Sequence, residues 1–151
     1  MKTFLQIAFV ILAPLFLKAQ TSNWITISSV YTIEQTVDML QKTIQQKGFK
    51  LFATINHSQE AETAGLKLRP TILLMLGNPK AGTVLMNCNQ QIGIDLPLKI
   101  LVWEESDGQI KAGFINPEIF FKEYKLEDCK DVLPRMKAVL QDLVATVARK
   151  N

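Results

Sequence analysis

A glycine-rich segment between two patterned stretches contains the residues of this chain that are best suited to hold a ligand. The apolar run 72–76 ends abruptly, and the segment 77–83, with sequence GNPKAGT, leads into a helical pattern. Backbone N–H groups at the start of a helix attract anions, and Lys80 can add a positive charge there. The glycine spacing resembles that of a phosphate-binding P-loop, but the lysine that should precede Thr83 is absent, which argues against nucleotide hydrolysis. The alternative is an ordinary strand-to-helix turn, in which Gly and Pro serve only the backbone.

Two further polar side chains follow patterned segments. His57, the only histidine, comes at the end of an alternating segment, where it can act as a general base or a pocket donor near neutral pH, or simply as a capping or surface residue. Asp95 precedes Leu96 and Pro97, where an aspartate can be catalytic or can favour a turn for backbone reasons. If these segment ends meet at one rim of the fold, they form a shallow polar pocket. The predicted ligand-binding residues are His57, Gly77, Asn78, Pro79, Lys80 and Asp95.

The composition predicts neither a metal site nor a cofactor. A single histidine and two cysteines, Cys88 and Cys129, offer no metal-ligand spacing. The two cysteines either form one disulfide, which export would permit, or remain independent thiols, since Cys88 falls on an apolar helical pattern. The sequence assigns no catalytic residue, and whether the protein is an enzyme stays open.

The first residues have the pattern of a secretory signal peptide. Lys2 precedes the apolar run 4–17, and Ala19 is a small residue suited to cleavage, so residues 1–19 are expected to be removed. The apolar run is shorter than the about 20 residues of a membrane span, and a retained single-span anchor is the alternative. The protein is therefore expected to be exported, to the periplasm or the medium, with no stable membrane anchor after cleavage.

Net charge gives no argument for nucleic acid as a partner. The formal charge is +3, and removal of Lys2 and Lys18 with the signal peptide lowers it by two. No basic stripe lies between the aromatic residues, as a nucleic-acid platform would need. The expected partners are a small-molecule ligand and other copies of the same chain.

Residues 20–151 have the size and pattern of a single domain. The elements follow the order β-α-β-(short α)-β-α-β-β-α, and Asp107-Gly108 between two alternating segments predicts a hairpin. This order predicts an α+β fold with a single, mainly antiparallel sheet and helices packed on it. Strands are expected at 24–31, 49–55, 71–76, 98–105 and 109–116, and helices at 33–47, 58–64, 83–94 and 117–124, with a long C-terminal helix whose first turn includes Pro134.

Two patterns make more detailed predictions about which side chains are buried. In the second strand, strict alternation would place on one face Phe49, Leu51, Ala53 and Ile55, while Phe52 interrupts the polar face. In the helix expected at 83–94, the apolar residues Val84, Cys88 and Ile92 would form one buried stripe.

A series of short motifs resembles the successive landmarks of one protein family. They are NHSQEA at 56–61, GL at 65–66, RPT at 69–71, GNP at 77–79 and DLPLK at 95–99, followed by Gly108 and Asn116-Pro117. Together they resemble the domain of unknown function 302 family over roughly 30–148. The resemblance implies a TATA-binding-protein-like α+β fold, often as a homo-oligomer, and that name describes topology without implying DNA binding. It implies no agreed substrate, cofactor or catalytic residue. Where the family often has a basic residue and a histidine, this chain has FKEY at 121–124.

Three hypotheses of function follow. The leading one is a small-ligand binding module for an anionic or amphipathic ligand. The second is a hydrolase or isomerase that uses His57 and Asp95, which requires the imidazole to lie within hydrogen-bond reach of a carboxylate or a nucleophile. The third is an oligomeric interaction protein, which requires an exposed apolar surface.

Overall fold

The computed structural model describes residues 23–148 and confirms the predicted α+β class. The predicted signal peptide lies outside the described residues. One five-stranded antiparallel sheet has the strand order β1-β5-β4-β3-β2. Its strands are β1 Trp24–Ser28, β2 Lys50–Asn56, β3 Thr71–Gly77, β4 Leu98–Glu104 and β5 Ile110–Ile115. The helices are α1 Ile33–Gln46, α2 His57–Thr63, α3 Pro79–Cys88, α4 Phe120–Tyr124 and α5 Val132–Ala145, with short 3-10 turns η1 Gln90–Ile94, η2 Pro117–Ile119 and η3 Glu127–Cys129.

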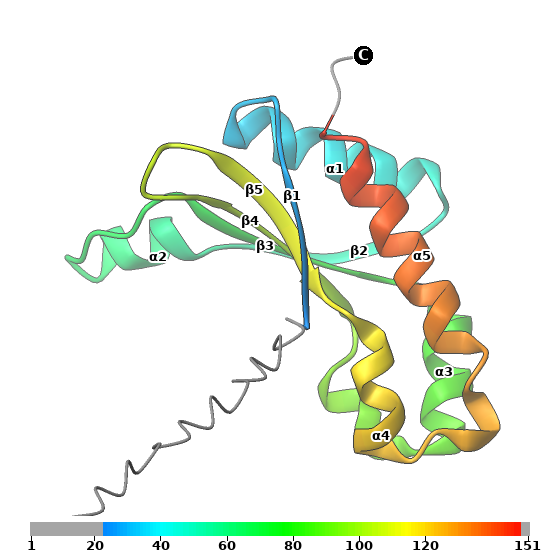
Figure 1. Ribbon diagram of the computed structural model, residues 1–151. Coiled ribbons are helices and arrows are strands. Elements are labelled where there is room, and N and C mark those ends of the chain that lie inside the picture. Colours follow the sequence, from blue (N-terminus) through cyan, green and yellow to red (C-terminus); the bar gives the residue numbers. More distant parts are fainter. Residues whose placement is uncertain (1–22, 149–151) are drawn as a thin grey trace, which may run out of the picture.

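The hydrophobic core lies between one face of the sheet and the two long helices, α1 and α5, which lie on the same side of the sheet (Figure 1). Alternate strand residues point into it, because side chains of a strand alternate between its two faces. The fully buried members include Leu40, Leu74, Ile100, Phe114 and Leu140. Each such side chain stabilises the fold by about 1.5–3 kcal/mol through burial alone.

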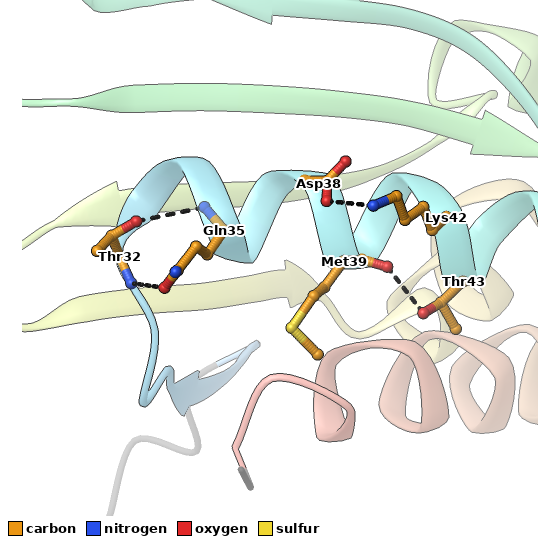
Figure 2. A network of polar contacts seen from close by, with 6 residues as sticks. All are labelled: Thr32, Gln35, Asp38, Met39, Lys42 and Thr43. Atoms are coloured by element: carbon orange, nitrogen blue, oxygen red, sulfur yellow. Dashed lines mark hydrogen bonds and ion pairs between the residues drawn. The ribbon is translucent and has the colours of Figure 1, made fainter. Parts of the chain in front are cut away.

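The first helix begins where the sequence predicts it. Thr32 Oγ1 accepts a hydrogen bond from the N–H of Gln35, and Gln35 Oε1 accepts one from the N–H of Thr32 (Figure 2). These two bonds form a capping box, which satisfies backbone donors that the first turn of a helix leaves without partners. One turn further on, the Nζ of Lys42 lies 2.7 Å from Asp38 on the exposed face of α1. The buried face carries Ile33, Thr36, Leu40 and Ile44.

The strict alternation predicted for the second strand is wrong. The register pairs Leu51 with Leu76 but Ala53 with Met75, so a bulge separates the two halves of β2. Beyond the bulge, Thr54 lies on the face that α1 covers, where its Oγ1 accepts a hydrogen bond from Gln41 Nε2 at 2.9 Å. A bulge adds one residue to a strand and reverses the faces of the residues that follow. The apolar break in the pattern at Phe52 falls at this bulge.

The third helix begins four residues earlier than predicted, and its predicted buried stripe is wrong. Asn78 caps it and Pro79 occupies its first position, where the missing N–H of proline costs nothing. Within α3, Leu85 is the buried residue, whereas Val84 is 48% exposed and Cys88 is exposed. Ile92 is buried, but it belongs to the separate turn η1, which Asn89 caps.

The remaining turns follow their sequence signals. Gly108 has a φ of 80° in the turn between β4 and β5, a left-handed conformation that favours glycine. Pro134 lies in the first turn of α5, as predicted.

Cys88 and Cys129, for which the sequence allows either a disulfide or two independent thiols, form a disulfide that joins the end of α3 to η3, just before α5. Across residues 23–148, no helix combines the length and apolar character that a membrane crossing needs.

Candidate functional site

The main candidate site is a cavity of about 660 Å³ between α3 and α5, at the end of the sheet where β3 stops and β4 begins. We call it the apolar pocket. One wall is a single face of α5, formed by Val132, Arg135, Met136 and Val139. These residues recur at positions i, i+3, i+4 and i+7, the spacing that places side chains on one side of a helix.

The opposite wall comes from α3, and the base comes from the strand ends. Ala81 and Val84 project from α3, Phe52 comes from the bulge of β2, and Leu96-Pro97 comes from the turn before β4. Val84 and Phe52 are 48% and 43% exposed, although large apolar side chains usually avoid water. The fold therefore leaves apolar surface uncovered within a concave site.

Two glycines bring the backbone close to this pocket. A Cβ added to Gly77 would lie 3.5 Å from a ring carbon of Phe52, and one added to Gly82 would lie 3.6 Å from Leu96 Cδ1. These are ordinary van der Waals contacts, and neither glycine has a left-handed φ. Both positions therefore shape the pocket through their small size and are not required by backbone conformation.

The polar side chains of the pocket are mostly engaged in local bonds. Asn78 Oδ1 accepts the N–H of Lys80 at 3.0 Å, and Thr83 Oγ1 donates to the carbonyl of Pro79 at 2.8 Å. Arg135 is the one ionisable residue among those that line the cavity, and it makes no hydrogen bond or ion pair with any residue in the range 23–148. The pocket thus combines an apolar interior with a single unneutralised cation.

Part of the predicted ligand-binding set lies at this pocket. Gly77, Asn78 and Pro79 line it, while Lys80 is exposed on α3 beside it and does not line it. Asp95 lies at the same end of the sheet, since it precedes β4, but it lines a different cavity.

The structure does not bring His57 to this end of the sheet. The register pairs Lys50 with Gly77 and Asn56 with Ile72, so β2 carries His57 to the opposite end from Asn78. At about 3.3 Å per residue, the length of β2 separates them by roughly 20 Å, beyond the reach of one small ligand. The expectation of a common rim for His57, Asn78 and Asp95 is therefore wrong. The neighbouring strands β2 and β3 run in opposite directions, so their last residues lie at opposite ends of the sheet.

His57 also lacks the surroundings that acid–base catalysis would need. It is exposed as the first residue of α2, and no carboxylate or hydroxyl among the described residues hydrogen-bonds to it. Because Asp95 lies at the other end of the sheet, the two residues do not form the pair that the hydrolase or isomerase hypothesis requires. Residues 23–148 likewise contain no group of three His, Cys, Asp or Glu side chains that could hold a metal.

Asp95 is engaged within the fold. Its Oδ2 accepts a hydrogen bond from the hydroxyl of Tyr124 at 2.5 Å, and its backbone oxygen accepts one from Lys99 Nζ at 2.8 Å. The hydrogen bond to Asp95 is the main reason why the pKa of Tyr124 is raised to about 12, and partial desolvation and the negative charge of Asp95 act in the same direction. These contacts hold α4 against the turn before β4.

Sequence reasoning missed the residues that give the apolar pocket its character, namely Phe52, Val84 and Arg135. Two signals were available. Phe52 interrupts the polar side of its strand, and Arg135 shares the i, i+3, i+4, i+7 pattern of α5 with Val132 and Val139.

Comparisons with known proteins agree with the fold and define the family. A structure entitled "uncharacterized conserved protein DUF302 from Bacillus stearothermophilus" superimposes with a TM-score of 0.76, at 21% identity, over 82% of this chain and 97% of that chain. At this identity the likeness shows the fold alone.

Two curated relatives share part of the sequence. The fluoride-specific ion channel FluC 1 of Brucella suis biovar 1 is 32% identical over 111 residues, which cover 74% of this chain and 44% of that protein. FluC 1 of Brucella abortus biovar 1 is 32% identical over 111 residues, covering 74% of this chain and 41% of that protein. This chain thus spans less than half the length of these relatives. The family model described as "Domain of unknown function DUF302" matches residues 25–143. The chain therefore belongs to the DUF302 family.

Proposed function

We propose that this protein is a small-ligand binding module whose site is the apolar pocket between α3 and α5. The observation that carries the proposal is the cavity itself. Its volume of about 660 Å³ falls within the range of roughly 300–1,000 Å³ that is usual for small-molecule sites. The residues that line it are mainly apolar. Two of these side chains, Phe52 and Val84, are 43% and 48% exposed.

A neutral apolar dye, N-phenyl-1-naphthylamine, tests the proposal because its fluorescence increases when it leaves water. The wild-type protein should bind it saturably. Val84→Glu should weaken binding at least about tenfold, since a carboxylate then enters an apolar site. Because Val84 is 48% exposed, the same change should leave the fold intact.

Ile94→Glu is the matched control. Ile94 is 81% exposed and does not line the pocket, so the same substitution should leave dye binding unchanged. The proposal fails if the wild type shows no saturable binding, or if the two variants weaken binding equally.

Native mass spectrometry of the protein purified from its own host is an independent experiment, which shows whether a natural ligand is retained.

A second candidate function, an oligomeric interaction protein, is favoured by the face of the sheet that points away from the core. Leu73, Leu101 and Trp103 point to this face and are partly exposed. Trp24 is 45% exposed, and its ring meets that of Trp103 edge-on at 6.1 Å between centroids. Light scattering should give a mass above that of one chain, and Trp24→Glu should lower it. A single-chain mass at all concentrations would reject this candidate.

We also propose that the protein acts outside the cytoplasm. The signal-peptide pattern of residues 1–19 supports export, and the bond between Cys88 and Cys129 fits it because disulfides persist in oxidising compartments. The intact mass of the host-expressed protein decides the matter. A mass that begins at Gln20 supports export with cleavage, and a mass that includes residues 1–19 speaks against it.

A further inference from the structure

Arg135 is placed as a cation at the edge of an otherwise apolar cavity. It follows Val132 and precedes Met136 on the face of α5 that lines the pocket, and its side chain is exposed. No carboxylate neutralises it among residues 23–148. By contrast, Lys137, two positions later, is paired with Glu118 at 2.7 Å. Among the described residues that line the pocket, the only charged side chain is therefore positive.

The start of α3 does not supply a competing anion site. Pro79 has no N–H, the N–H of Lys80 is donated to Asn78 Oδ1 at 3.0 Å, and the N–H of Gly82 is donated to the Asn78 carbonyl at 3.0 Å. The backbone groups that usually attract an anion at a helix start are thus largely occupied. Arg135, on the opposite wall, is the group able to bind a negative charge.

Resting on the proposed function, we propose that the ligand is an amphipathic carboxylate, with its apolar body in the pocket and its carboxylate at Arg135. The planar guanidinium presents two parallel N–H groups that match the two oxygens of a carboxylate. The apolar walls, including Phe52, Val84 and Leu96, contact the remainder of the molecule. A neutral ligand gains only the apolar contacts, and a cationic ligand is repelled by Arg135.

Displacement of N-phenyl-1-naphthylamine by three molecules with the same chain and different head groups tests this proposal. Decanoate should compete about tenfold better than decanol, as expected for charge-assisted hydrogen bonds, and decylamine should compete worst. The preference for decanoate should shrink in 1 M salt, because screening weakens an exposed charge pair.

Arg135→Gln should abolish the preference of decanoate over decanol, with both competitors measured against the neutral dye bound to the same variant. Lys80→Gln is the matched control, because it removes a positive charge close to the pocket from a residue that does not line it. This control should keep the full preference for decanoate.

The outcomes separate the two proposals. If the wild-type protein does not bind the dye, the proposed binding function itself is overturned. Normal dye binding with equal competition by decanoate and decanol overturns only the carboxylate proposal. Equal loss of preference in Arg135→Gln and Lys80→Gln would also overturn it, since the selectivity would then reflect the overall charge.

Discussion

The hydroxyl of Tyr124 donates a hydrogen bond to Asp95 Oδ2 at 2.5 Å, and this contact joins α4 to the turn before β4. Asn89 Nδ2 adds a second link, because it donates to the backbone oxygen of Tyr124 at 2.9 Å. Loss of the phenolic proton would break the hydrogen bond to Asp95 and leave two negative groups in contact, which is why the pKa of Tyr124 is raised to about 12. The pair is a structural connection at the end of the sheet that also carries the apolar pocket.

The raised pKa of Tyr124 predicts a loss of stability at alkaline pH. The folded-state value of about 12 exceeds the ordinary value of 10.0, so the contribution of this contact is complete below pH 10 and is lost as the pH rises to 12. The difference between the ultraviolet titration curves of the wild type and Tyr124→Phe should have its midpoint near 12. A midpoint near 10 would show that the contact is absent in solution.

Removal of the disulfide should destabilise the protein and loosen the apolar pocket. The bond closes a loop with a sequence separation of 41, for which the chain-entropy relation gives about 4 kcal/mol. Cys88→Ser is the suitable change because Cys88 is exposed, whereas Cys129 is 6% exposed and a serine there would be buried. Denaturant unfolding should show a loss of about 2–4 kcal/mol. Reduction of the wild type should reproduce this loss, and Cys88→Ser should no longer respond to reductant.

The buried hydroxyls of Ser29 and Thr36 should make non-additive contributions to the free energy of unfolding. Their oxygens lie 2.6 Å apart, and because Thr36 Oγ1 donates to the Thr32 carbonyl, the Ser29 hydroxyl must donate to Thr36. Thr36→Val leaves the buried Ser29 donor without its acceptor and should cost about 1–3 kcal/mol. The double variant Ser29→Ala/Thr36→Val should be less destabilised than the sum of the single variants. Strict additivity in denaturant unfolding would contradict this arrangement.

Two glycine-to-alanine changes should have opposite signs. A Cβ at Gly113 would lie 2.9 Å from the backbone oxygen of Ile25, so Gly113→Ala should cost about 1–3 kcal/mol by forcing β1 and β5 apart. A Cβ at Gly82 would lie 3.6 Å from Leu96, and α3 would gain about 0.5–1 kcal/mol from the lower chain entropy of alanine. Melting temperatures of the two variants test the contrast, and a stabilised Gly113→Ala would contradict it.

Local signals in the sequence were sufficient for most of the fold. Thr32 and Gln35 gave the capping box of α1, and Gly108 gave the hairpin, because each signal depends on a few neighbouring residues. The antiparallel character of the sheet followed from the order of the elements.

The errors arose where pairing across the sheet decides the result. Phe52 interrupts the alternation of β2, but this break does not by itself indicate a bulge, since a bulge is defined by the partner strand. The start of α3 differs from the prediction because Asn followed by Pro is compatible both with a loop and with a helix cap, and here it forms the cap. The predicted proximity of His57 and Asn78 requires β2 and β3 to finish at the same end of the sheet, whereas these antiparallel neighbours finish at opposite ends. The site itself depended on Arg135, whose significance appears only when α5 lies against α3.

The position of β1 in the sheet affects the order in which the strands can pair during synthesis. Strands β3, β4 and β5 each pair with the strand that precedes them in the sequence, so β2 to β5 can assemble as they leave the ribosome. Trp24 of β1, however, pairs with Ile115 of β5, which is separated from it by more than half of the chain. Such distant pairing is slow because a large loop must close first. β1 therefore stays unpaired and accessible to chaperones until β5 has been synthesised, and the sheet closes only after residue 115 has left the ribosome.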